Sequence, residues 1–179
     1  MDQAVRKAVE SLCACAALRS AARSTTQLYD LVLQPSGLKA TQFTALRTIA
    51  EAGEIAQWKF ARENAIAVET LSRRFTALRK KGLISSRVGG NHGERIYRLT
   101  EQGKEALNRA IPYWERAQER LRQTLGTAEM DALLKICEDA VEAARQAEQL
   151  RASNASGPHP PMPPAQPFQS PGTEQSAAA

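Results

Sequence analysis

The sequence predicts a mainly helical protein with one small β-hairpin, and three observations support that fold class. Only 5% of the 179 residues are aromatic while 42% are hydrophobic, a balance that favours helices over an extensive sheet. Apolar residues recur at helical spacing through most of residues 4–150. Residues 83–99 instead alternate around a glycine-rich centre, which is typical of two short strands joined by a turn.

The N-terminal part of the chain predicts three helices in succession. A long first helix is expected over residues 4–33, where apolar side chains follow two neighbouring stripes and a Pro-Ser-Gly turn ends the pattern. Thr41 is positioned to cap a second helix, which Gly53 ends. A short helix follows at about residues 57–64, so a compact helical segment precedes the hairpin.

A further helix is expected at about residues 68–81, with Gly82 in the usual C-terminal position. The predicted strands, 83–88 and 95–99, follow at once and enclose a flexible tip at 89–93. Two short helices with a tight link and then a hairpin form the pattern of a winged helix-turn-helix. The side chains of the helix that should face inward are apolar: Val68, Leu71, Phe75 and Leu78.

The C-terminal part predicts two long helices and a tail. Thr100 and Glu101 begin the first helix, Gly126 breaks it, and Thr127 caps a second one over residues 128–150. From residue 152 the chain is rich in Pro and almost uncharged, a composition that cannot build a core and predicts disorder.

The outer helices carry more apolar surface than a small winged module can cover, so we expect a second copy of the chain to cover it. The predicted organisation has four parts: an N-terminal dimerisation helix (1–34), a winged helix-turn-helix (35–103), C-terminal dimerisation helices (104–151) and a disordered Pro-rich tail (152–179).

Positive charge is concentrated in the central module. Residues 36–104 hold 13 Lys and Arg against 6 Asp and Glu, whereas residues 105–150 hold 6 against 9. Such a surplus is also compatible with ordinary solubilising charge, but beside a winged-helix pattern it favours double-stranded DNA as the partner. The helix at 68–81 would then enter the major groove, and the hairpin would lie along the backbone and reach the minor groove.

Ten side chains of these two elements are expected to contact DNA: Glu69, Thr70, Ser72, Arg73, Arg74, Arg87, Asn91, His92, Arg95 and Arg98. Within this set Arg73 is expected to read a base, and Arg95 to contact the backbone.

Three segments, TQFTALRTIAEAG, TLSRRFTALRKKGLI and ERIYRLTEQGKEAL, resemble the MarR family of bacterial winged-helix regulators. The resemblance covers roughly residues 10–150, and its most specific parts are Gly-Leu-Ile after the recognition helix and Leu-Thr-x-x-Gly after the wing. It implies a two-fold homodimer with interleaved terminal helices, acting as a repressor on an operator. The family usually has an Asp-Arg pair in the wing; here the wing reads Asn-His-Gly-Glu-Arg, and Arg95 is expected to replace that arginine.

The first helix resembles a second group, the organic-hydroperoxide regulators of the OhrR branch. A reactive cysteine precedes a Leu-Tyr pair there, and Cys15 and Tyr29 match that spacing. Fourteen residues of helix span about 21 Å, so the resemblance implies that Tyr29 of one chain approaches Cys15 of the other. Cys137 is the candidate resolving cysteine. The alternative for both cysteines is a thiol packed in a core.

A small aromatic or phenolic anion is the alternative effector, with Trp58, Tyr113 and Trp114 as candidate pocket residues, although core packing explains these three equally well. A third hypothesis is a protein-interaction adaptor that uses the Pro-rich tail. Enzyme activity is not expected, because the chain has two His, no Gly-rich phosphate loop and no nucleophile beside a base. No cofactor, metal or membrane contact is expected, and the predicted location is cytoplasmic.

Overall fold

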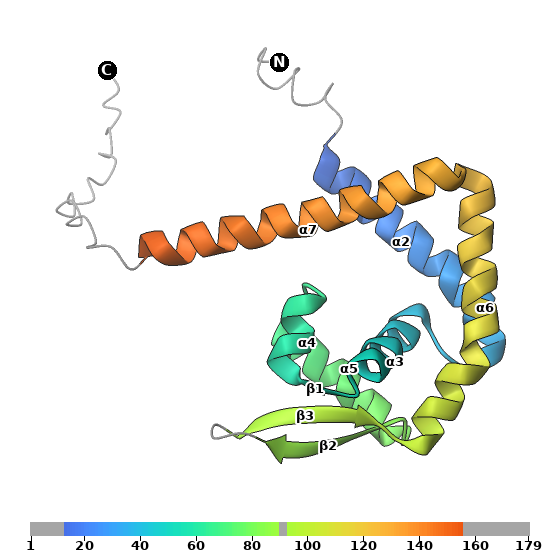
Figure 1. Cartoon of the computed structure of the whole chain (residues 1–179), viewed down its shortest axis with the longest axis vertical. Coiled ribbons are helices and arrows are strands. Elements are labelled where there is room, and N and C mark those ends of the chain that lie inside the picture. Colours follow the sequence, from blue (N-terminus) through green and yellow to red (C-terminus); the bar gives the residue numbers. More distant parts are fainter. Residues whose placement is uncertain (1–12, 90–92, 156–179) are drawn as a thin grey trace, which may run out of the picture. The chain divides into compact units, whose positions relative to one another are not determined.

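The computed structural model describes residues 13–89 and 93–155 (Figure 1). The chain divides into two units, Met1–Ile136 and Cys137–Ala179. Its elements are α2 (Ala14–Leu33), η1 (Gln34–Ser36), α3 (Ala40–Ala52), β1 (Glu54–Ala56), α4 (Gln57–Glu63), α5 (Val68–Lys80), β2 (Ile84–Gly89), β3 (Glu94–Leu99), α6 (Glu101–Leu125) and α7 (Thr127–Ala155). This mainly helical architecture with a small antiparallel sheet confirms the predicted fold class.

The sheet has three strands in the order β1-β3-β2, with both pairs antiparallel (Figure 1). The hairpin of β2 and β3 was predicted within one residue at each end. The third strand, β1, was missed because its three residues are too few to show an alternation. Ile55 of β1 and Ser86 of β2 both pair with Tyr97 of β3, so these three side chains share one face of the sheet.

That face of the sheet packs on the helices of the winged module. The Phe75 ring lies edge-on to Tyr97, with centroids 4.5 Å apart, and edge-on to Phe60 at 4.9 Å. Leu71 and Leu78 are buried beside Phe75, as the helical spacing predicts. Val68 was expected inward but is 45% exposed, because it is the first residue of α5 and lies outside the packed turns.

The start of α3 differs from the expectation in its capping residue. The helix begins at Ala40, and the Asp30 carboxylate of α2 accepts a hydrogen bond from the Ala40 amide at 2.7 Å. Gln42 Oε1 accepts another from the Lys39 amide at 3.1 Å. Thr41 therefore does not cap this helix. A carboxylate ten residues away satisfies the free amide, and a local sequence pattern does not reveal such a cap.

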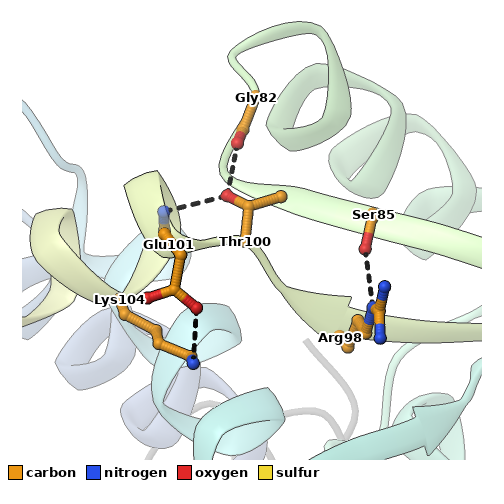
Figure 2. A network of polar contacts seen from close by, with 7 residues as sticks. Gly82, Ser85, Arg98, Thr100, Glu101 and Lys104 are labelled. Atoms are coloured by element: carbon orange, nitrogen blue, oxygen red, sulfur yellow. Dashed lines mark hydrogen bonds and ion pairs between the residues drawn. The ribbon is translucent and has the colours of Figure 1, made fainter.

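The Leu-Thr-x-x-Gly motif makes the junction between the wing and α6. Thr100 Oγ1 accepts a hydrogen bond from the Gly103 amide at 3.0 Å and donates one to the Gly82 carbonyl at 2.5 Å (Figure 2). A side chain at Gly103 would overlap the Leu83 carbonyl oxygen, so glycine allows α6 to approach the end of the recognition helix. The predicted start of the long helix at Thr100 and Glu101 is confirmed, with Thr100 as its cap.

The last helix is longer than predicted. It runs from Thr127 to Ala155, so residues 152–155, expected in the disordered tail, are helical. The remainder of the tail, residues 4–12 of the first predicted helix, and the tip residues Asn91 and His92 lie outside the described residues. None of the helices in the described part of the chain is both long and apolar enough to cross a bilayer.

Candidate nucleic-acid interface

The recognition helix α5 separates a core face from an exposed stripe. Its buried residues, Leu71, Phe75 and Leu78, recur at helical spacing and attach the helix to the module. The opposite side of the same turns is exposed and carries charged and hydroxyl groups at the same spacing: Glu69, Arg73, Thr76 and Lys80. Thr76 and Lys80 were not among the predicted contacts, although they continue the three- and four-residue spacing that starts at Arg73. The Thr76 hydroxyl donates to the Ser72 carbonyl at 2.8 Å, so Lys80 is the added residue with free donors on this stripe.

Ser72 lies on one flank of this stripe and is only half-exposed. Its Oγ accepts a hydrogen bond from Gln57 Nε2 at 2.6 Å and donates one to the Val68 carbonyl at 2.9 Å. A hydroxyl has one proton to donate, and here that proton is used within the helix. Ser72 therefore makes two contacts within the protein, and its contact with a base edge stays a prediction.

Thr70 and Arg74 lie on the other flank of the stripe. Thr70 is half-exposed and Arg74 is exposed. Arg74 also lines a cavity of about 370 Å³ formed by α2, α3, α4 and α5. Arg74 is thus located where the predicted DNA surface meets this cavity.

The three arginines of the wing divide between the two faces of the sheet. Arg95 is exposed and shares a face of β3 with Tyr97, which packs on the recognition helix. Arg98 lies on the opposite face, where its Nε donates to Ser85 Oγ at 3.3 Å (Figure 2). Arg87 lies on the same face as Arg98. Arg98 pairs with Ser85 of β2, and Arg87 lies two residues after Ser85 on that strand, so the two side chains point the same way.

Arg87 forms an ion pair with Glu54 of β1, with Nη2 and Oε2 2.6 Å apart. The hydrogen bond from Arg87 lowers the pKa of Glu54, and the charge of Arg98 acts in the same direction. The Glu54 carboxylate in turn raises the pKa of Arg87. Arg95 is therefore the predicted wing contact that lies on the side of the recognition helix, and DNA contact by any of the three stays a prediction.

The three aromatic residues proposed for an effector pocket do not come together. Trp58 is 51% exposed on α4 and donates from Nε1 to Glu94 Oε2 at 2.7 Å. Trp114 of α6 stacks on Phe43 with ring centroids 5.7 Å apart, and Tyr113 points toward Arg116 instead.

The 370 Å³ cavity of the single chain is lined by another set of residues, and an effector pocket at Trp58, Tyr113 and Trp114 stays a prediction. The walls of the cavity combine apolar side chains, among them Phe60 and Phe75, with two cationic ones, Lys39 and Arg74. Periodicity marked these apolar residues as core, and a sequence does not reveal where core packing leaves a space.

The thiols of Cys13, Cys15 and Cys137 are free and exposed. The alternative prediction, that Cys15 and Cys137 pack in the chain's own core, is therefore wrong. Tyr29 is half-buried between α2 and α6, where its hydroxyl donates to Gln118 Oε1 at 2.5 Å. Burial raises the pKa of Tyr29, and the charge of Arg122 acts in the opposite direction. The contact of Tyr29 with Cys15 of a second chain stays a prediction.

The fold and this surface together define a winged-helix regulator, and the comparisons with known proteins identify its family. No family model and no curated protein matches the sequence. The crystal structure of the M. tuberculosis transcriptional regulator MosR is 32% identical, covers 76% of this chain and 96% of that chain, and has a TM-score of 0.61. With that likeness across nearly all of MosR, the chain belongs to the MarR family of transcriptional regulators.

Two solved complexes with DNA are also similar. MosR in complex with DNA is 29% identical, covers 76% of this chain and 98% of that chain, and has a TM-score of 0.69. A mutant of MarR from E. coli, in complex with operator DNA, is 18% identical, covers 69% of this chain and 89% of that chain, and has a TM-score of 0.63. At that identity the likeness to MarR is one of fold. The resemblance of the first helix to the OhrR branch stays a prediction.

Proposed function

We propose that this protein is a homodimeric, sequence-specific DNA-binding regulator that acts as a repressor. The observation that carries this proposal is the exposed stripe of α5 with Arg73 at its centre, together with the exposed Arg95 on the face of the sheet that packs on α5. The crystal structures of MosR and MarR with DNA support the same use of the fold.

The two elements would contact DNA in different ways. Arg73 projects from the middle of the stripe, where a planar guanidinium can donate two hydrogen bonds to a guanine edge in the major groove. Lys80 at the end of α5 and Arg95 in the wing would neutralise phosphates, which positions the protein without reading sequence. Specificity would therefore rest mainly on α5.

The proposed dimer rests on exposed apolar side chains in the outer helices. On α2, Leu18 and Leu31 are 39% and 64% exposed. On the first part of α7, Leu134 and Ile136 are 51% and 57% exposed. A second copy would cover such side chains and present two recognition helices about 34 Å apart, one turn of DNA.

Two mechanisms of release from DNA follow from the features of the chain. In the first, the Cys15 thiolate attacks an organic hydroperoxide, which yields a sulfenic acid on Cys15 and an alcohol. Cys15 is exposed in the single chain, and Tyr29 would have to exchange Gln118 for sulfur as its acceptor. In the second, a small aromatic or phenolic anion enters the 370 Å³ cavity, where Lys39 and Arg74 supply positive charge.

The test of the main proposal is selection of a duplex from a randomised library by the full chain. We expect one enriched sequence with two-fold symmetry, bound by a dimer in sedimentation at the same salt concentration. A monomer that enriches no sequence at low salt would contradict the proposal. Removal of residues 152–179 should leave this binding intact, whereas an adaptor that acts through the tail would lose its function.

The two release mechanisms differ in which compound releases the Cys15→Ser variant from the selected duplex. One equivalent of organic hydroperoxide should release the unsubstituted protein but not Cys15→Ser if the thiol is the sensor. A phenolic anion such as salicylate should release both proteins if the cavity is the sensor, and Lys39→Ala should weaken that response. Release of Cys15→Ser by the hydroperoxide would exclude the thiol mechanism.

A further inference from the structure

The first residue of α4 connects the recognition helix to the wing. Gln57 Nε2 donates to Ser72 Oγ of α5 at 2.6 Å, and Gln57 Oε1 accepts from the Tyr97 hydroxyl of β3 at 3.4 Å. One amide group thus contacts both elements of the proposed DNA interface. Gln57 itself is half-buried, and Tyr97 is only 3% exposed.

The next residue makes a second contact with the same strand. Trp58 Nε1 donates to Glu94 Oε2 at 2.7 Å, at the start of β3. The Arg62 guanidinium lies 5.2 Å from the centroid of the Trp58 ring, on the same helix. The indole is therefore held between a cation and a carboxylate although about half of it is exposed.

The backbone places these two residues where they can act on both elements. The pairing of β1 with β3 ends at Ala56 and Ile96, and α4 starts with the next residue. Gln57 and Trp58 are thus fixed to the sheet through β1. The edge-on contacts of Phe75 with Phe60 and Tyr97 hold the same three elements together through apolar packing. Ring contacts of this kind tolerate small rotations, whereas a hydrogen-bonded amide restricts direction.

We propose that Gln57 and Trp58, here called the α4 bracket, are positioning residues that set the angle between the recognition helix and the wing. The inference rests on the proposed DNA-binding function and adds to it residues that act through Ser72, Tyr97 and Glu94. Without the Gln57 amide, the buried Tyr97 hydroxyl loses its hydrogen-bond acceptor. A buried donor without a partner is costly, so a shift of the wing that gives the hydroxyl a new partner is favoured. Base contacts need aligned donors, whereas phosphate contacts tolerate displacement, so sequence discrimination depends on the bracket more than overall affinity does.

Tyr97→Phe is the most informative variant because Tyr97 is buried. The substitution removes one hydroxyl, keeps the ring against Phe75 and changes almost nothing on the surface that would face DNA. Gln57→Leu and Trp58→Phe remove the other donors. The matched control is Glu51→Gln, which removes an exposed ion pair with Arg47 at 3.4 Å within α3.

The experiment uses the full chain, the duplex that the unsubstituted protein selects from a randomised library, and a scrambled duplex of equal length. For Tyr97→Phe and Gln57→Leu we expect the ratio of the two affinities to fall about fivefold, the value of roughly one hydrogen bond. Binding to the scrambled duplex should stay within about twofold, and Glu51→Gln should leave both affinities unchanged. Gln57→Leu combined with Ser72→Ala should lose no more than Gln57→Leu alone, because both substitutions remove the same contact.

The outcomes separate the bracket from the function on which it rests. Failure of the unsubstituted chain to select any duplex would overturn the proposed function. A selected duplex whose affinity ratio is unchanged in Tyr97→Phe, Gln57→Leu and Trp58→Phe would overturn the bracket alone. Hydrogen exchange without DNA is the second measurement: Gln57→Leu should speed exchange in both α5 and β3, and unchanged exchange in either element would also overturn the bracket.

Discussion

Across the middle strand of the sheet, the Arg87 guanidinium lies 2.6 Å from the Glu54 carboxylate, joining the two outer strands β1 and β2. This pair lies on the face of the sheet opposite Tyr97, whereas Arg95 lies on the same face as Tyr97 and the recognition helix. Three arginines of one hairpin, equivalent in the sequence, are therefore placed in different surroundings. Because Arg87 is held by Glu54 and Arg95 is not, we expect the two arginines to contribute differently to the affinity for DNA.

Arg95→Ala should weaken binding to every duplex and reduce the slope of log affinity against log salt by about one, as expected for the loss of one phosphate contact. Arg87→Ala should have the smaller effect on affinity, because its guanidinium is already paired with Glu54. Titrations at several salt concentrations, by fluorescence anisotropy, measure both quantities. A larger loss with Arg87→Ala than with Arg95→Ala would show that the ion pair opens to contact DNA.

The Glu54 pair also predicts a dependence of stability on pH. The folded-state pKa of Glu54 lies below its ordinary value of 4.5, so its stabilising effect is present above that value and is lost as the pH falls through the folded-state pKa. Glu54→Gln should therefore reduce stability at neutral pH and flatten its decline in acid. The effect should be small, because both side chains are exposed and salt screens the pair.

Denaturant unfolding at neutral and acidic pH measures this change. Arg87→Gln is the matched variant, and in it the pKa of Glu54 followed by NMR should rise toward 4.5. A Glu54 pKa that does not respond to Arg87→Gln would show that the pair is absent in solution.

Gly103→Ala tests the close approach at the junction of the wing and α6. Helix propensity alone predicts that this change stabilises the protein by about 0.5–1 kcal/mol. The structure predicts the opposite sign, because the new methyl group would overlap the Leu83 carbonyl oxygen, and overpacking of this kind costs about 1–3 kcal/mol. Thermal or denaturant unfolding distinguishes the two signs. Gln102→Ala, at an exposed position one residue earlier, is the control and should change stability little.

The sequence predicted most helices and both strands of the wing, because their signals are local. Gly53 and Thr100 marked helix ends through backbone and capping chemistry that acts within a few residues. The missed features depend on contacts between distant segments. Asp30 caps α3 from another helix, and β1 is too short to show a strand pattern.

The features of the candidate interface that could be predicted from the sequence are also the local ones. Helical periodicity identified which residues of α5 face outward, including Arg73. It did not reveal that the Ser72 hydroxyl is used by Gln57, because that partner lies on another helix fifteen residues earlier. Nor did it separate Arg95 from Arg87, because the distinction depends on the strand register and on Glu54 of β1.

Arg73 and Lys80 occupy the same exposed stripe but should contribute to binding in different ways. Arg73 projects from the second turn of α5, where a recognition helix comes nearest to base edges, and Lys80 lies at its end, beside the expected backbone. Arg73→Ala should cost about 1–3 kcal/mol on the selected duplex and relax base choice at one position of each half-site. Lys80→Ala should weaken binding to all duplexes alike and lower the salt slope by about one.

Repeating the selection with each variant measures the base preference directly. If Arg73→Ala selects the unchanged sequence and weakens all duplexes equally, Arg73 contacts phosphate, and base reading must come from other residues of the stripe.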